Sequence, residues 1–149
     1  MKKILSIAIV ALISLSFTTA QWQADFEKAK QTAKEKHELI LLNFSGSDWC
    51  GPCIRMRREI FDNTSFLSVA DNNLVMVNAD FPRNKKNQPD KAIKKQNEAL
   101  ADKYNPEGKF PYTLLIDPSG KVVKAWDGLP EEDAIKFSAE VKAICDAHR

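Results

Sequence analysis

Apolar residues recur every three to four positions in three stretches of the chain, which is the spacing of one face of an amphipathic helix. The residues on these faces are Trp22, Phe26, Ala29 and Ala33; Ile93, Leu100 and Tyr104; and Ala134, Phe137, Val141 and Ile144. Each stretch is predicted to be a helix with that face turned to a core, and the third is expected to run from Glu131 to Ala147.

A fourth helix is expected to begin at Gly51. Pro52 suits a first helical turn, and the apolar residues Ile54 and Phe61 stand seven positions apart. The polar residues Asp62 to Ser65 ("DNTS") are expected to end this helix, and Phe66 to Ala70 is expected to form one more turn.

Four short runs between these helices have the length and composition of strands. They are Leu39 to Phe44, Leu74 to Asn78, Tyr112 to Ile116 and Lys121 to Trp126. The last two flank the turn letters "DPSG" and are predicted to form a β-hairpin. The order α-β-α-β-α-β-β-α predicts an α/β fold in which helices cover a central mixed β-sheet.

The first 20 residues have the pattern of a cleavable signal peptide. Lys2 and Lys3 precede an apolar run from Ile4 to Phe17, and small residues stand three and one positions before a cut after Ala20. This run is shorter than the ~20 apolar residues that span a bilayer. We therefore expect export and cleavage, with no membrane span in the remaining chain.

Composition narrows the classes of partner. The chain has 22 Lys and Arg against 20 Asp and Glu, and loss of Lys2 and Lys3 with the leader makes these numbers equal. A neutral chain lacks the basic surplus that is typical of nucleic-acid binding. Three cysteines are too few for a disulfide-stapled scaffold, and only Cys50 and Cys53 are close in sequence.

The pair Cys50 and Cys53 stands where a strand meets a helix. Cys50 falls at the helix N-terminus, where unpaired N–H groups and the helix dipole favour an anion and so lower the pKa of a thiol. Cys53 lies one turn further on, is expected to be less exposed, and can attack a mixed disulfide formed at Cys50. Gly51 and Pro52 shape the turn between them. The spacing favours a reactive dithiol.

Two other roles for the pair remain open at this point. It can be a structural disulfide, or half of a metal site. A metal site needs about four ligands, and the other soft or imidazole donors, Cys145, His37 and His148, have no ligand spacing. No metal or other cofactor is therefore expected, and neither histidine is expected to be catalytic.

The letters "SDWCGPC" after an apolar strand resemble the active site of the thioredoxin superfamily. The resemblance continues through "VNADFPRNKK", "KKQNEALADKYN" and "FPYTLLIDPSGKVV", in that order. From about Phe26 to Ile144 the chain is similar to exported bacterial thioredoxin-like proteins, akin to the C-terminal domain of the membrane thiol–disulfide interchange protein. The resemblance implies a thioredoxin fold, with helices on both faces of the sheet.

The resemblance also implies roles for the matching residues. Cys50 would be the attacking nucleophile, Cys53 the resolving cysteine, and the two would form the redox disulfide. Trp49 would belong to the partner-binding surface. Pro111 would be the family's cis-proline, which orients the backbone of an incoming substrate, since proline tolerates the cis form.

Two positions depart from thioredoxin. Asn43 stands where thioredoxin has a buried acid that moves protons to and from the resolving cysteine, and the nearby Asp48 is expected to be more exposed. We therefore expect a slower or differently pH-dependent resolution step. Phe110 and Tyr112 flank Pro111 in "FPYT", so a bulkier, more aromatic partner groove is expected.

The remaining candidates are weaker. Cys145 is expected to be a buried, inert thiol, since free cysteine packs as a small hydrophobe. The arginines Arg55, Arg57 and Arg58 either steer acidic partners or form a solvated helix face. A run of basic residues is expected to be a solvated surface. These residues are Arg83, Lys85, Lys86, Lys91, Lys94 and Lys95.

The sequence therefore predicts a thiol–disulfide oxidoreductase with one domain over residues 21–149. Its Gly-Pro centre resembles that of reducing thioredoxins, so a reductase is the first choice of direction. Protein or peptide disulfides are the expected substrates, with an upstream thiol–disulfide electron donor, and the chain is expected to be a monomer. The expected location is a bacterial periplasm or cell envelope, with secretion as the alternative. The competing function is a non-catalytic binding module or metal carrier that uses the cysteines as ligands.

Overall fold

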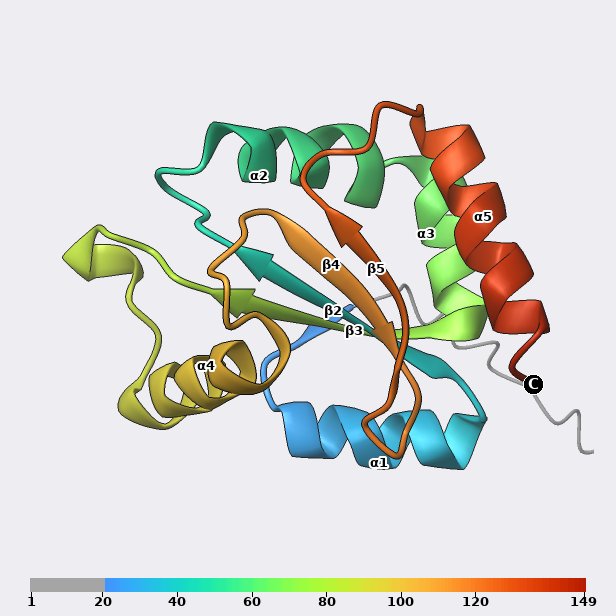
Figure 1. Ribbon diagram of the computed structural model, residues 1–149, viewed down its shortest axis with the longest axis horizontal. Coiled ribbons are helices and arrows are strands. Elements are labelled where there is room, and N and C mark those ends of the chain that lie inside the picture. The colour runs from blue at the N-terminus through green and yellow to red at the C-terminus, as the bar shows by residue number, and fades with distance from the viewer. Residues whose placement is uncertain (1–20) are drawn as a thin grey trace, which may run out of the picture.

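The computed structural model describes residues 21–149, so the predicted leader lies outside the described part of the chain. A five-stranded sheet has the order β1-β3-β2-β4-β5 (Figure 1). The strands are β1 (Trp22–Gln23), β2 (Leu39–Ser45), β3 (Leu74–Asp80), β4 (Tyr112–Ile116) and β5 (Val122–Asp127). β3 pairs in parallel with β1 and β2, and β4 pairs antiparallel with β2 and β5. The predicted mixed sheet and hairpin are confirmed.

Helices fill the connections between the strands. They are α1 (Phe26–Lys36), α2 (Gly51–Met56), α3 (Thr64–Asn73), α4 (Lys91–Tyr104) and α5 (Ala134–Asp146). A π-helical turn, η1 (Arg57–Phe61), continues α2, and η2 (Lys85–Asn87) is a short 3-10 turn. Four helices begin beside a side-chain oxygen that accepts a backbone N–H of the first turn, which explains where they start. These N-cap residues are Asp25, Asn63, Asp90 and Asp133.

Strand alternation divides the core into two layers. In β2, Leu39 and Leu41 face α2, η1, α3 and α5, whereas Ile40, Leu42 and Phe44 face α1 and α4. Figure 1 shows these two groups of helices on opposite faces of the sheet. The predicted thioredoxin-like arrangement, with helices on both faces, is thereby confirmed.

Three expectations about individual residues are wrong. Trp22 lies in β1 rather than in the first helix, because that helix begins only after its cap at Asp25. Ile54 is 44% exposed, because Cys53 and Met56 are the residues of α2 that face the core. The single turn expected after "DNTS" is the ten-residue helix α3, started by its own cap.

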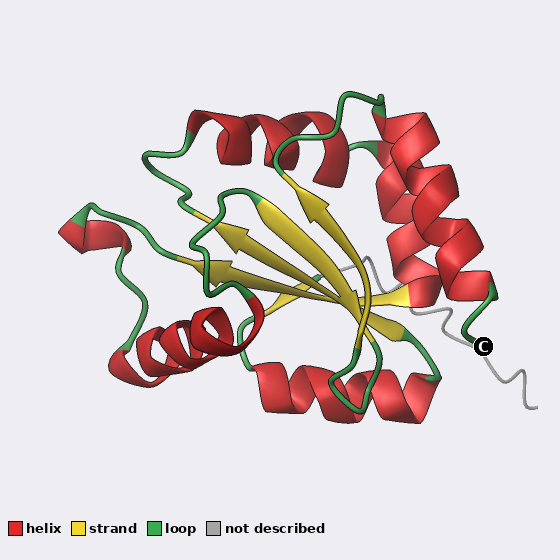
Figure 2. Ribbon diagram, in the orientation of Figure 1, coloured by secondary structure: helices red, strands yellow, loops and turns green. Residues whose placement is uncertain are grey.

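The sheet topology places two loops at one edge. β2 and β3 are parallel, so the segments that follow them, residues 46–50 and 81–90, leave the same edge of the sheet, as Figure 2 shows. Over residues 21–149, no helix is long and apolar enough to cross a membrane.

Candidate active site

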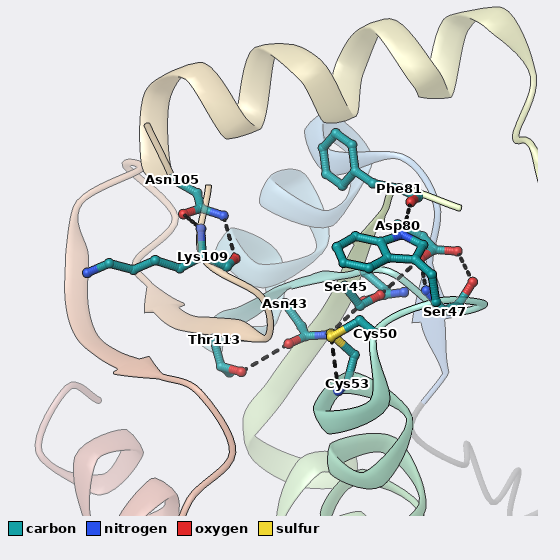
Figure 3. Close-up of a disulfide and its surroundings, with 12 residues drawn as sticks. Asn43, Ser45, Ser47, Cys50, Cys53, Asp80, Phe81, Asn105, Lys109 and Thr113 are labelled. Carbon is teal, nitrogen blue, oxygen red and sulfur yellow. Dashed lines mark hydrogen bonds between the residues drawn. A yellow bond between two sulfur atoms is a disulfide. The ribbon is translucent and has the colours of Figure 1, made fainter. Parts of the chain in front are cut away.

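Cys50 and Cys53 form a disulfide at this edge, with their Cα atoms 5.2 Å apart (Figure 3). Cys50 is the N-cap of α2, and its Sγ accepts the backbone N–H of Cys53 at 3.2 Å. A backbone N–H donor at a helix N-terminus is the kind of group that stabilises a cysteine thiolate. Gly51 and Pro52 lie exposed in the first turn of the helix.

The two sulfur residues are equally buried in the disulfide form. Cys50 and Cys53 are each 5% exposed, so the expectation that Cys53 is the less exposed of the two is wrong. Burial alone therefore does not distinguish the two cysteines in this form.

Trp49 is held in place beside the dithiol. Its indole N–H donates to the carbonyl of Phe81 at 2.8 Å, and its ring meets the ring of Phe110 edge-on at 5.5 Å. Gly46 makes room for the indole, since a Cβ there would lie 2.2 Å from Trp49 Cε2. Phe81 also meets Phe110 edge-on, at 5.6 Å. Three aromatic rings thus form one group at the site.

Asp48 is half-buried and anchors the loop that follows β3. Its carboxylate accepts the backbone N–H groups of Arg83 and Asn84, both at 2.9 Å, and the side-chain amide of Asn87 at 3.0 Å. These donors, led by Arg83 N–H, hold the pKa of Asp48 below its ordinary value.

Asn43 is 5% exposed and lies at the centre of a polar row under the dithiol. It pairs in register with Asn78 of β3 and Thr113 of β4. Its amide donates to Asn78 Oδ1 at 2.8 Å, and its carbonyl accepts the Thr113 hydroxyl at 3.0 Å. Both Asn43 and Cys53 line a cavity of about 250 Å³. The side chains beside Cys53 in this row are therefore neutral hydrogen-bonding groups.

Asp80 organises the turn that leads to the dithiol. Its Oδ1 accepts the Ser45 hydroxyl at 3.1 Å and the Ser47 backbone N–H at 2.9 Å, and its Oδ2 accepts the Ser47 hydroxyl at 2.5 Å (Figure 3). Ser45 and Asp80 are register partners on β2 and β3. No local pattern in the sequence points to Ser45, Asn78 or Asp80, because only the pairing of the strands brings them to the site.

The loop before β4 carries the predicted proline. The peptide bond between Phe110 and Pro111 is cis. Asn105 closes this loop, since its amide donates to the Lys109 carbonyl and its Oδ1 accepts the Lys109 N–H, both at 2.9 Å. The contact of Phe110 with Trp49 places Pro111 at the dithiol end of the sheet. Tyr112 opens β4 opposite Phe44 and tilts against its ring.

The arginines that follow the dithiol pair with acids of their own helical segment. Arg55 and Arg58 reach Glu59 at 3.1 and 2.7 Å, and Arg57 reaches Asp62 at 2.7 Å. This pairing is the pattern of a solvated helix face rather than of a free cationic surface.

The other candidates lie apart from the dithiol. Cys145 is buried in α5, and burial raises the pKa of its thiol to about 11. His37 ends α1 in the left-handed conformation, and His148 bonds the Ile144 carbonyl at the end of α5. Residues 21–149 bring no three His, Cys, Asp or Glu side chains together as a metal cluster.

Comparison with known proteins agrees with this geometry. A family profile described as thioredoxin-like matches residues 21–118. The chain belongs to the thioredoxin-like family. It is 39% identical over 101 residues to the disulfide bond reductase DsbH of Chlamydia pneumoniae, and 30% identical over 125 residues to the thioredoxin-related protein DsbJ of that species. These alignments cover 68% and 76% of this chain but 58% and 35% of the relatives, so the chain spans about half or less of their length.

Solved structures agree on the fold. A DsbH oxidoreductase superposes with a TM-score of 0.78 at 27% identity, covering 95% of this chain and 94% of that one. The oxidised C-terminal domain of Neisseria meningitidis DsbD gives 0.52 at 18% identity, over 78% of this chain and 89% of that domain. The latter supports the fold alone. The predicted thioredoxin superfamily membership is confirmed, and the predicted oxidoreductase class agrees with these relatives.

Proposed function

We propose that this protein is a thiol–disulfide oxidoreductase that reduces protein or peptide disulfides through Cys50 and Cys53. The observation that carries the proposal is the backbone N–H of Cys53 on the sulfur of Cys50, at the start of α2 in a thioredoxin-like fold. A structural disulfide has no need of a donor that stabilises one of its sulfurs as a thiolate. The printed name of the DsbH relative supports the same class.

The reaction has two thiol–disulfide exchanges. The Cys50 thiolate attacks one sulfur of the substrate disulfide, and the other substrate sulfur leaves as a thiolate that takes up a proton. Cys53 then loses its proton to solvent and attacks Cys50 Sγ, which releases the second substrate thiolate and closes the disulfide. Two electrons pass from the dithiol to the substrate, and a thiol donor must supply two electrons to restore it.

Surrounding residues position these steps. Trp49, Phe110 and Pro111 form the surface that an incoming chain meets, and Gly51 and Pro52 keep the turn short enough for the ring to close. Asn43 and the cavity beside Cys53 provide a neutral polar route for the proton that Cys53 loses.

The direction can be tested by equilibrating the purified protein with glutathione at neutral pH and measuring the fraction of disulfide. We expect a reduction potential at or below about −230 mV, which is the range of reductants. A value between about −120 and −180 mV is that of oxidases and isomerases, and it would contradict the reductase assignment.

The alternative is a binding module or metal carrier that uses Cys50 and Cys53 as ligands. Elemental analysis of the purified protein separates the two functions. Stoichiometric metal together with no reduction of insulin would favour the carrier. Insulin reduction that disappears when Cys50 is replaced would favour the enzyme.

We further propose that the protein acts as an exported monomer of the bacterial envelope after cleavage behind Ala20, with residues 21–149 as its one domain. The charged and apolar leader supports this location, because it has the pattern of a cleavable signal peptide. Mass spectrometry of the cell fractions should find a mature chain that begins at Gln21.

A further inference from the structure

The loop that follows β3 is tied to the residues directly before Cys50. Its Phe81 carbonyl accepts the Trp49 indole N–H at 2.8 Å, and its Arg83 and Asn84 N–H groups bind the Asp48 carboxylate, both at 2.9 Å. Residues 48 and 49 therefore hold the loop through side chains that point at its backbone. We call residues 81–87 the basic loop, because they include Arg83, Lys85 and Lys86.

The basic loop places one cation against Trp49 and exposes two more further along. The Arg83 guanidinium lies over the Trp49 ring, 4.1 Å from its centre. Lys85 and Lys86 stand on η2, whose backbone is fixed by the Asn84 side chain accepting the Lys86 N–H at 3.2 Å. All three side chains are exposed.

These cations are not neutralised locally. In the part of the chain that the structure describes, none of the three forms an ion pair. The two acids nearest in the site are already engaged: Asp48 accepts the N–H groups of the loop, and Asp80 accepts the hydroxyl and N–H groups of Ser45 and Ser47. These neutral donors do not cancel the charges of Asp48 and Asp80, and three cations against two carboxylates still leave a positive surplus.

The opposite side of the dithiol differs. There Arg55, Arg57 and Arg58 are paired with Glu59 and Asp62. The two sides therefore differ in pairing: the arginines of the helix hold acidic side chains, whereas the cations of the basic loop form no ion pair and stay open to an acidic partner.

We propose that the basic loop selects disulfide substrates that carry acidic residues next to their cysteines. This inference rests on the proposed reductase function and names its substrate class. The positive charges of Arg83, Lys85 and Lys86 attract an acidic segment. Because Arg83 lies over Trp49, the residue before Cys50, this attraction brings the segment to the dithiol. Such complementarity raises the rate of productive encounter and discriminates against basic segments, which the loop repels.

The test uses two synthetic peptides that share one intramolecular disulfide ring and differ only in flanking residues, Asp and Glu in one and Lys in the other. The rate constant kcat/KM for their reduction is measured with the reduced mature protein. We expect the acidic peptide to react about tenfold faster at low ionic strength, and the preference to fall to about twofold at 0.5 M salt because screening weakens steering.

A loop variant and a matched control locate the effect. The double substitution Lys85→Glu with Lys86→Glu should abolish or reverse the preference. The control, Lys28→Glu with Lys34→Glu, makes the same change in net charge on exposed positions of α1, which covers the face of the sheet opposite α2. It should keep the preference. Equal rates for both peptides in the unmodified protein, or equal loss of preference in the two variants, would overturn the proposal.

A third variant tests whether the fixed position of the loop matters. Asp48→Ala removes a negative charge, so charge alone predicts a stronger preference for the acidic peptide. Loss of the anchor predicts a weaker preference, which is the result we expect; a stronger preference would overturn the role of Asp48. If neither peptide nor insulin is reduced at all, the proposed function itself fails, which is distinct from reduction without a charge preference.

Discussion

The protein contains two cysteine environments that are equally buried but differ chemically. Cys50 and Cys53 are each 5% exposed and Cys145 is 3% exposed. Cys50 caps a helix and receives a backbone N–H on its sulfur, whereas Cys145 sits within α5 in the apolar layer around Phe137 and Val141. Burial raises the pKa of Cys145 to about 11. We therefore expect backbone donors at the sulfur, rather than exposure, to make Cys50 reactive and leave Cys145 inert.

The two cysteine environments also differ in the contacts on which they depend. The dithiol depends on long-range contacts, among them Asp80 with Ser47, Asp48 with the basic loop, and Asn43 with Thr113. Cys145 needs only an apolar space of the right size. Changes at the dithiol should therefore alter activity first, and changes at Cys145 should alter stability alone.

The sharpest contrast comes from removing each sulfur. In Cys50→Ser the rate of insulin reduction should fall to the uncatalysed background, because a serine hydroxyl is a far weaker nucleophile than a thiolate at neutral pH. Cys145→Ala should retain activity within about twofold, since its thiol is neutral and distant from the site. Insulin turbidity with dithiothreitol as the reductant measures both variants. A third variant, Cys53→Ser, should accumulate a mixed disulfide at Cys50 that mass spectrometry detects.

Activity in Cys50→Ser would contradict the expectation that Cys50 is reactive and Cys145 is inert.

A second test disturbs the packing around the dithiol and leaves its sulfurs unchanged. In Gly46→Ala the new Cβ would lie 2.2 Å from Trp49 Cε2, so the indole must move and its bond to the Phe81 carbonyl must break. We expect overpacking to lower the free energy of unfolding by about 1–3 kcal/mol, and insulin reduction to fall several-fold.

Gly51→Ala is the matched stability control for this change. No atom lies within 4 Å of a Cβ built at Gly51, which is a helical position. Alanine there should leave the free energy of unfolding unchanged or raise it by up to about 1 kcal/mol. A loss of stability in Gly46→Ala no larger than that in Gly51→Ala would contradict the expected clash between residue 46 and the Trp49 indole.

A third test concerns the proton that leaves Cys53. Asn43→Asp places a carboxyl in the neutral polar row beside the cavity that Cys53 lines. Burial should raise the pKa of that carboxyl, so that it titrates within the working range and acts as a base only above its pKa. We expect the rate of the resolution step to gain a new pH-dependent rise, measured by stopped-flow Trp fluorescence between pH 5 and 9. Asn78→Asp, one strand away, is the comparison, and an unchanged profile in Asn43→Asp would contradict the proposed role of position 43.

The sequence predicted those parts of this site that local patterns encode. The dithiol at a strand-to-helix junction needed only the apolar run before Cys50 and the helix signals after it. The limits of the four predicted strands were correct to within about two residues, whereas β1 was not predicted. Pro111 followed from a resemblance to a family, not from its local pattern.

Other parts depend on register and on long-range contacts that no local pattern carries. Asn78 and Thr113 meet Asn43 only because their strands pair in one particular register. The anchoring of Arg83 by Asp48 joins residues 35 positions apart. Trp22 was assigned to a helix because its spacing to Phe26 fits a helical face, although the cap at Asp25 starts the helix later. Exposure of Ile54 was missed because the apolar face of α2 belongs to Cys53 and Met56.

The smallest expected effect lies at Cys145 and appears only in alkali. Its pKa is raised from 9.0 to about 11 in the folded protein, chiefly by burial, which Arg149 offsets in part. Below pH 9 the thiol is neutral in both the folded and the unfolded protein. The free energy of unfolding is then not reduced by ionisation of Cys145. Between pH 9 and 11 the unfolded thiol ionises first, so the unfolded state binds fewer protons and the free energy of unfolding falls with pH. The loss should reach about 1–2 kcal/mol.

Lysines also titrate in this range, so the measurement is a difference between two proteins. Urea unfolding at pH 8 and at pH 10.5 should show a larger fall for the unmodified protein than for Cys145→Ala, which has no thiol to ionise. Iodoacetamide should likewise modify Cys145 in the folded protein only as the pH approaches 11, while reduced Cys50 reacts near neutrality because its thiolate is stabilised. Identical falls in stability for the two proteins, together with fast alkylation of Cys145 at pH 8, would mean that burial does not suppress this thiol. Any difference in reactivity between Cys50 and Cys145 would then come from the helix N-terminus at Cys50 alone.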